Sequence, residues 1–244
     1  MLFRSGLWSR VRQQVWQDVA PTPTGHWAYR SLLPMSLLPK RWREPQVRVW
    51  MAPGMHAVHY PVRRGEWLNV VLLIEGSDAM AQSGWDVNRA PELIQADVQR
   101  ALRGLCHDVH DVLRSVEQWR VWSLHSRPVV RSAQDLVRAR VALLGDAAHP
   151  MLPYLAQGAG MALEDAQALA QCLQERPEAQ AWEVALHAYA ERRWARSAQV
   201  QRAALRNAHI FHASGPLAWA RNTALRWAAP RLMDQPWLYG AAPP

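Results

Sequence analysis

The sequence has almost no lysine, few cysteines and no long apolar segment. Lys40 is the only lysine, so arginine carries nearly all the charge of the 28 basic residues. Cys106 and Cys172 are too few for a disulfide framework or a cysteine-based metal site, which fits a reducing cytoplasm. No apolar run approaches the ~20 residues of a transmembrane helix, and no secretory signal is evident at the N-terminus. We therefore expect a cytoplasmic protein without a transmembrane segment.

Composition indicates a globular protein with a basic surface. Half of the 244 residues are hydrophobic, which is enough for a sizeable core. The net charge of +8 could indicate nucleic-acid binding. However, the arginines are spread along the chain and no DNA- or RNA-binding motif accompanies them, so we expect no nucleic-acid partner. An anionic cofactor, anionic substrates and a high-GC coding bias explain the charge equally well.

The most informative stretch runs from Val141 to Ala170. The apolar segment Val141–Leu144 has the pattern of a buried strand and ends at Gly145-Asp146. A loop with prolines and glycines follows, and apolar residues at helical spacing predict a helix from about Met161. Glu164 and Asp165 are expected in its first turn, where they suit the positive end of the helix dipole.

This order of elements predicts a ligand site. A carboxylate at the end of a strand and the backbone N–H groups of a helix N-terminus would face the same crevice. A ligand there would offer hydroxyl groups to Asp146 and carbonyl oxygens to the amides. The alternative is that Asp146 only caps a turn after the strand.

Alternating apolar residues predict antiparallel strands between Gly25 and Ile74, and helical spacing recurs further on. The expected strands are Val47–Met51, His56–Val62, Leu68–Ile74 and Trp119–Pro128. The expected helices are Ala90–Leu105 and, from about Ala179, a long helix to Phe211, and Val109–Val116 is expected to be a short helical or turn segment.

The segment LLGDAAHPMLPYLAQGAGMALEDA resembles the GD motif of the FAD-dependent aromatic hydroxylases. These are single-component flavoprotein monooxygenases with the fold of p-hydroxybenzoate hydroxylase, and the likeness is to salicylate-hydroxylase-like members. Near the N-terminus, Gly6, Ser9 and Arg12 match the second FAD motif of the family, although Ser5 stands where the family has aspartate.

The resemblance covers only the C-terminal part of that family's fold. A Gly-x-Gly-x-x-Gly fingerprint needs a βαβ unit of ~30 residues, and only five residues precede Gly6. We therefore expect a truncated product, a mis-called start or a domain completed elsewhere.

The fold that the resemblance implies is mixed α/β (α+β), with part of a Rossmann-like FAD domain, an antiparallel substrate sheet and long C-terminal helices. The expected domains are a remnant of the FAD domain at 1–24, a substrate-binding β-sheet domain at 25–128, the GD motif and its helix at 129–175, and a C-terminal helical region at 176–244.

The resemblance also implies an FAD cofactor, with NAD(P)H as co-substrate. Asp146 would bind the ribityl hydroxyls, Ala159 and Gly160 would donate backbone N–H groups to the flavin pyrimidine, and Pro153 would lie against the isoalloxazine. The full set of implied cofactor-binding residues is Arg12, Gly145, Asp146, Pro153, Gly158, Ala159, Gly160 and Met161.

Activation of a phenolic substrate needs a base or polar relay. His56 and Tyr60 are the best candidates, since residues four apart on a strand share one face, and relatives use a His-x-x-x-Tyr pair on a comparable strand. Gln157 could bind the substrate's phenol or carboxylate, and Pro153 would lie near the reacting ring. The alternatives are a sheet histidine bonded to a backbone carbonyl and an amide that stabilises its own loop. No histidine spacing indicates a metal site.

The resemblance implies hydroxylation of an aromatic, salicylate-like acid with NAD(P)H and O2. The alternative is a non-catalytic remnant or interaction module of the same fold. The sequence leaves open the substrate, the position of hydroxylation, the choice of NADH or NADPH and the oligomeric state.

Overall fold

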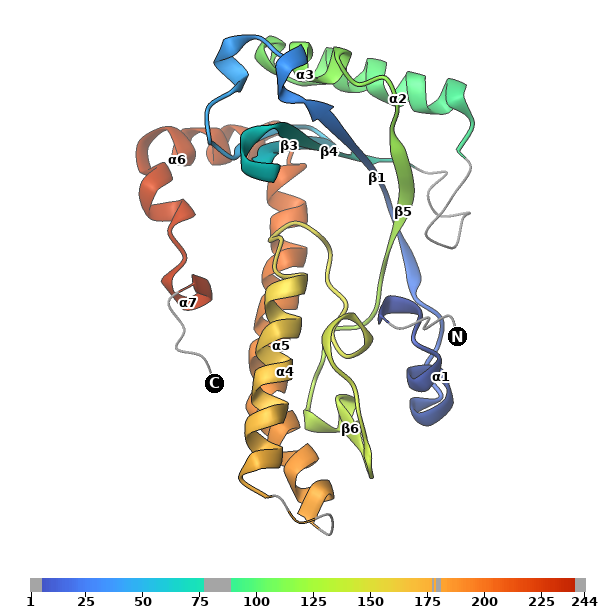
Figure 1. Ribbon diagram of the computed structural model, residues 1–244. Coiled ribbons are helices and arrows are strands. Elements are labelled where there is room, and N and C mark those ends of the chain that lie inside the picture. The colour runs from blue at the N-terminus through green and yellow to red at the C-terminus, as the bar shows by residue number, and fades with distance from the viewer. Residues whose placement is uncertain (1–5, 77–88, 177, 179–180, 240–244) are drawn as a thin grey trace. The chain divides into compact units, whose positions relative to one another are not determined.

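The computed structural model describes residues 6–76, 89–176, 178 and 181–239. They divide into two compact units. Figure 1 shows the chain coloured by residue number. The first unit contains the described residues of Met1–Thr22, His125–Ala208 and Ala228–Pro244, and the second contains those of Pro23–Leu124 and His209–Trp227.

The second unit is built on a five-stranded sheet with the strand order β2-β3-β4-β1-β5. Its strands are β1 (Thr22–Pro34), β2 (Arg48–Ala52), β3 (Met55–Val62), β4 (Trp67–Glu75) and β5 (Arg120–Ser126). The β1–β4, β2–β3 and β3–β4 pairs are antiparallel, which confirms the alternation seen in the sequence. The 3-10 turn η4 (Arg63–Gly65) joins β3 to β4.

Helices cover one face of this sheet. They are α2 (Pro91–Gly104), η6 (His107–Val109) and α3 (His110–Arg114), with the short η2 (Met35–Leu37) and η3 (Lys40–Trp42) between β1 and β2. Trp27, Tyr29 and Leu72 of the sheet share a core with Leu105 and Val112 of the helical layer. The helix predicted at Ala90–Leu105 is confirmed, and the segment predicted as helical or turn contains the short helix α3. Pro91 begins α2, where its missing N–H costs no hydrogen bond.

The first unit is mainly helical. Its elements are η1 (Gly6–Trp8), α1 (Arg10–Trp16), η7 (Ala133–Asp135), β6 (Val137–Arg138), β7 (Val141–Ala142), η8 (Gly145–Ala147), α4 (Gly158–Gln174) and α7 (Pro236–Tyr239). Two long helices, α5 (Trp182–Phe211) and α6 (Gly215–Met233), contribute residues to both units. Figure 1 shows α4 and α5 side by side, and a core that includes Ala168, Cys172, Tyr189 and Ala190 joins them.

The structure corrects three details of the prediction. The predicted strand Val141–Leu144 is only two residues long, because β6 is its one partner in the described part of the chain. Helix α4 begins at Gly158, three residues earlier than expected, so Glu164 and Asp165 lie in its second turn rather than its first. The long helix starts at Trp182, and residues 179–180 of the prediction lie outside the described residues.

The mixed helical and antiparallel fold agrees with the predicted fold class. Among the described residues, no helix combines the length and the apolar character that a membrane span requires.

Candidate functional site

Asp146 lies beside the N-terminus of α4, as the order of elements predicts. A Cβ atom placed on Gly158 would lie 3.7 Å from Oδ1 of Asp146. By helix geometry, the N–H groups at the start of α4 have no acceptor within the helix. Ala159 and Gly160 are exposed there, so a carboxylate and free helix N–H groups share one surface of the first unit.

The glycines around this surface fall into two kinds. Gly145 has a φ of +54°, and a Cβ there would lie 3.1 Å from Cβ of Ala162, so the chain itself requires glycine. Gly158 and Gly160 have ordinary helical backbones, and a Cβ on Gly160 would lie 3.5 Å from Oε1 of Gln157, an ordinary contact. Because the protein does not need glycine at these two positions, their bare backbone suits the close approach of a ligand.

Asp146 as a whole is exposed to solvent, but neighbouring protein atoms partly desolvate its carboxylate. This desolvation raises the pKa of Asp146, and the nearby His149 acts in the opposite direction. Hydroxyl groups of a ligand would restore the hydrogen bonds that the carboxylate loses to burial.

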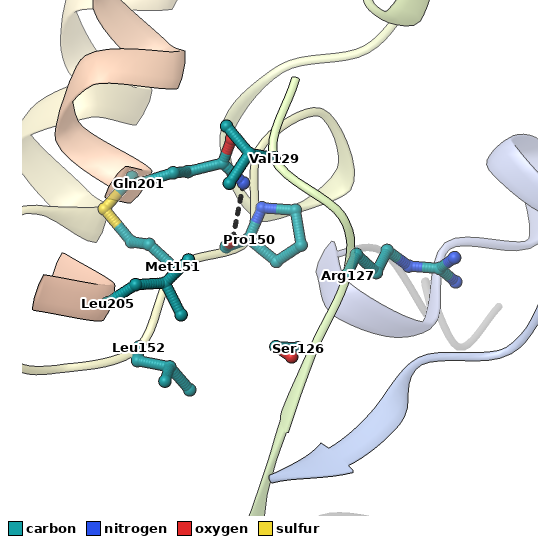
Figure 2. Close-up of a pocket in the computed structure, with 8 residues that line it drawn as sticks. All are labelled: Ser126, Arg127, Val129, Pro150, Met151, Leu152, Gln201 and Leu205. Carbon is teal, nitrogen blue, oxygen red and sulfur yellow. Dashed lines mark hydrogen bonds between the residues drawn. The ribbon is translucent and has the colours of Figure 1, made fainter. Parts of the chain in front are cut away.

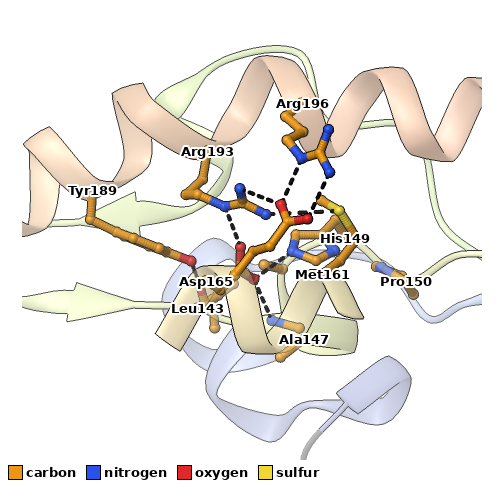
Figure 3. Close-up of polar contacts among 12 residues, drawn as sticks. Leu143, Ala147, His149, Pro150, Met161, Asp165, Tyr189, Arg193 and Arg196 are labelled. Carbon is orange, nitrogen blue, oxygen red and sulfur yellow. Dashed lines mark hydrogen bonds and ion pairs between the residues drawn. The ribbon is translucent and has the colours of Figure 1, made fainter. Parts of the chain in front are cut away.

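Beneath this surface, Asp165 forms a buried polar network (Figure 3). Its Oδ2 accepts hydrogen bonds from Nε2 of His149 at 2.6 Å and from the backbone N–H of Gly145 at 2.8 Å. Its Oδ1 accepts from Nε of Arg193 at 2.8 Å. Burial would raise the pKa of Asp165, but these donors outweigh it and hold the pKa below its usual value. Asp165 therefore ties the Gly145–His149 loop to α4 and α5.

Two arginines of α5 complete this network. Arg193 and Arg196 both donate to Glu164, at 2.8 Å and 2.6 Å, and the hydroxyl of Tyr189 donates to the backbone oxygen of Leu143 at 2.9 Å. Tyr189, Arg193 and Arg196 thus connect α5 to α4 and to the segment that contains Leu143. Sequence reasoning did not indicate that Asp165 lies at the centre of this network.

Arg12 holds the same loop from the other side. Its guanidinium donates to the backbone oxygens of Ala147 and Ala148 at 3.0 and 2.8 Å, and its Nε donates to Asp18 at 2.6 Å. Ser9 caps α1 by accepting from the backbone N–H of Arg12. The motif that contains Arg12 is thus folded against η8. A direct contact between Arg12 and a cofactor stays a prediction.

Pro153 and Gln157 lie in the loop between η8 and α4. Pro153 is exposed, and the amide of Gln157 donates a long hydrogen bond of 3.4 Å to the backbone oxygen of Leu155. This bond agrees with the alternative of a loop-stabilising amide and leaves a substrate role untested. Met161, by contrast, is fully buried, so its side chain packs inside the protein.

A small open pocket lies next to this loop (Figure 2). Its volume of about 220 Å³ includes the open mouth. The lining residues are Ser126, Arg127, Val129, Pro150, Met151, Leu152, Gln201 and Leu205. Gln201 of α5 donates to the backbone oxygen of Pro150 at 2.9 Å and accepts from the N–H of Val130 at 3.0 Å. Sequence reasoning missed Gln201 because its partners are 51 and 71 residues away.

His56 and Tyr60 lie on β3 of the second unit, at the predicted spacing. His56 is buried and Tyr60 is half-buried. His59 lies on the strand between them, with its ring against those of Trp42 and Trp50. Burial, followed by the neighbouring His212 and His26, lowers the pKa of His56 well below its usual value.

The partner of His56 is a histidine that the sequence did not indicate. Nδ1 of His56 lies 2.8 Å from Nε2 of His212, and Nδ1 of His212 donates to Oε1 of Glu75 at 2.9 Å. A neutral His212 that donates from Nδ1 accepts at Nε2, so His56 donates from Nδ1 and its Nε2 is the acceptor nitrogen. The side chain of His212, which is 156 residues away, thus orients the His56 ring.

Comparison with known proteins finds a family and several named relatives. Residues 5–204 match the family described as "FAD binding domain". The chain is 35% identical over 238 residues to 3-hydroxybenzoate 6-hydroxylase 1 of Aquipseudomonas alcaligenes, covering 96% of this chain and 57% of the relative. It is also 35% identical over 236 residues to the 3-amino-4-hydroxybenzoate 2-monooxygenase of Streptomyces cremeus, covering 96% and 56%.

Solved structures show the same fold. A salicylate hydroxylase in complex with its substrate has a TM-score of 0.69 at 24% identity, covering 92% of this chain and 56% of that one. Klebsiella pneumoniae HpxO with FAD and uric acid has a TM-score of 0.73 at 23% identity, covering 93% and 56%.

The first unit has a carboxylate beside a glycine-rich helix N-terminus, and the second unit is built on an antiparallel sheet. Both features agree with the family that the comparisons show. The chain belongs to the FAD-binding-domain family of FAD-dependent aromatic hydroxylases. It spans just over half the length of the curated relatives named above.

Proposed function

We propose that this chain supplies the flavin-side surface and the substrate sheet of an FAD-dependent monooxygenase that hydroxylates an aromatic acid with NAD(P)H and O2. The observation that carries the proposal is the position of Asp146, whose Oδ1 lies beside Gly158 at the start of α4. The family membership and the relatives' names support the same class of reaction.

On the flavin side, Asp146 would accept hydrogen bonds from the ribityl hydroxyls. The N–H groups of Ala159 and Gly160 would donate to the flavin pyrimidine carbonyl, and the positive end of α4 would stabilise negative charge there. Pro153 would lie against the ring. When bound, the cofactor supplies the redox chemistry that transfers one oxygen atom from O2 to the substrate.

On the substrate side, His56 and Tyr60 would contact the phenolic group. Nε2 of His56 is the acceptor nitrogen because Nδ1 donates to His212, so it would accept the hydrogen bond of the phenol. Tyr60, four residues along β3, would hold the substrate from the same face, and Gln157 would bind its carboxylate or phenol.

The proposal can be tested with a chimera that extends this chain to full length with the remaining part of the A. alcaligenes relative. We expect bound FAD and aromatic-acid-dependent oxidation of NAD(P)H with a hydroxylated product. The alternative is a non-catalytic member of the same fold. It would be supported by a folded chimera that holds FAD but does not oxidise NAD(P)H in the presence of any of the aromatic acids tested. A folded chimera without FAD would refute the proposed flavin surface.

A further inference from the structure

The second unit contains a cluster of metal-type ligands from three separate segments. His26 on β1, Glu75 on β4 and His212 after α5 bring one ligand atom each to within 4.8 Å of one another. Nδ1 of His212 is 2.9 Å from Oε1 of Glu75, and Nε2 of His26 is 4.0 Å from the same oxygen. The His26 and His212 rings stack with their centroids 5.2 Å apart.

These distances suit a small divalent ion. Zinc lies about 2.0–2.2 Å from nitrogen and oxygen ligands, so neighbouring donors of a tetrahedral site are roughly 3.4 Å apart. The separations of 2.9 and 4.0 Å lie on either side of that value, and rotation of the Glu75 carboxylate could equalise them. The side chain of Glu75 is 50% exposed, which gives an ion and its water ligands access from solvent.

The backbone holds all three residues in place. His26 and Glu75 are direct cross-strand partners in the β1–β4 register. The N–H of Glu75 donates to the oxygen of Gly54 at 2.9 Å, and the N–H of Gly54 donates to the oxygen of His212 at 3.0 Å. The turn at Gly54 therefore links the His212 segment to the end of β4, so the ligand atoms are gathered before any ion binds.

The chemistry of the three side chains also suits a metal. Imidazole nitrogens and carboxylate oxygens are common protein ligands of divalent transition-metal ions. Glu75 supplies the negative charge, which offsets the positive charge of Arg221 near His212.

We propose that His26, Glu75 and His212 form a binding site for a divalent transition-metal ion such as Zn²⁺. His56 would be the outer partner, since metal-bound histidines donate their second ring nitrogen to a neighbour. With Nδ1 on the ion, His212 carries its proton on Nε2 and donates to Nδ1 of His56. The His56–His212 hydrogen bond then reverses, and His56 moves its own proton to Nε2. If the proposed function holds, this reversal removes the acceptor that the phenol requires, so the ion would inhibit.

The test uses the 244-residue chain without flavin and without a histidine tag, so its outcome does not depend on the proposed function. Titration with Co²⁺ should give one equivalent per chain with the visible d–d bands of a four- or five-coordinate ion, and Zn²⁺ should displace it. Nitrogen-detected NMR of the imidazoles should show the proton of His56 moving from Nδ1 to Nε2 on Zn²⁺ addition.

Two ligand variants and one matched control make the assignment specific. Glu75→Gln and His26→Gln should each weaken Co²⁺ binding about tenfold or more, with the fold checked by circular dichroism. The control is His107→Gln, since the His107 and His110 rings lie 4.6 Å apart in the same unit, and this change should leave binding unaltered. Absence of stoichiometric Co²⁺ binding overturns the proposal. So does binding that survives both ligand variants.

Discussion

Nε2 of His149 lies 2.6 Å from Oδ2 of Asp165, and both side chains are almost completely buried. This bond joins the loop that carries Asp146 to the helix whose N-terminus faces it. The buried network is therefore the support of the exposed site, and the two can be tested separately.

Asp165→Asn should destabilise the fold. The substitution removes the negative charge opposite Arg193 and leaves that buried guanidinium with a single carboxylate partner, Glu164. Breaking a buried ion pair costs about 3–5 kcal/mol, which urea unfolding of the first unit would measure. Glu175→Gln is the control, because Glu175 pairs with Arg192 at the surface and its loss should change stability little.

The same residue predicts how stability depends on pH. The folded-state pKa of Asp165 lies below its ordinary value, so the unfolded chain binds more protons as the solution is acidified. Its stabilising contribution is present above the unfolded pKa and is lost as the pH falls through the folded pKa. Unfolding free energies measured from pH 6 downward, in steps of about one pH unit, should fall more steeply for the wild type than for Asp165→Asn. Equal slopes would contradict this assignment.

Asp146→Ala should weaken flavin binding without unfolding the chain. A charge-assisted hydrogen bond is worth about 1.5–3 kcal/mol, and each 1.4 kcal/mol is about tenfold in affinity. We expect a loss of one to two orders of magnitude, measured by flavin fluorescence on the full-length chimera, with circular dichroism as the fold control. Wild-type affinity in the folded variant would mean that the cofactor lies elsewhere.

Gly160→Val and Gly145→Ala should differ in their effects, the first mainly on bound flavin and the second mainly on stability. Gly160→Val adds a branched side chain where the flavin edge would approach, while the helical backbone has room for a Cβ, so it should reduce bound flavin more than stability. Gly145→Ala forces a side chain into positive φ and close to Ala162, so it should destabilise the unit itself. Thermal unfolding and flavin content, measured on both variants, separate the two effects.

His56→Ala and Tyr60→Phe should impair hydroxylation and leave FAD content near normal. Both residues lie on β3 of the sheet unit, away in sequence from the flavin-side loop. In the chimera we expect slower product formation, or NAD(P)H oxidation that is uncoupled from it. Unchanged turnover and coupling in both variants would remove the pair from the substrate site.

Local patterns predicted most of the elements because their causes are local. Alternation in His56–Val62 and Leu68–Ile74 reflects one buried and one less buried strand face, and the structure has β3 and β4 there. The helical spacing after Gly160 likewise follows from one buried face of α4. The boundary errors, such as the early start of α4 at Gly158, arise because glycines carry no apolar side chain that would extend the pattern.

The sequence by itself determined the family, the strand and helix order, and the place of Asp146 before a helix N-terminus, since each depends on neighbouring residues. Only the tertiary structure decided which distant groups share their hydrogen bonds. Asp165 meets Arg193 across 28 residues, and His56 meets His212 across 156. Such pairs leave no periodic pattern in the sequence. A buried polar group must form hydrogen bonds, and its partners come from whichever distant segments the fold packs against it.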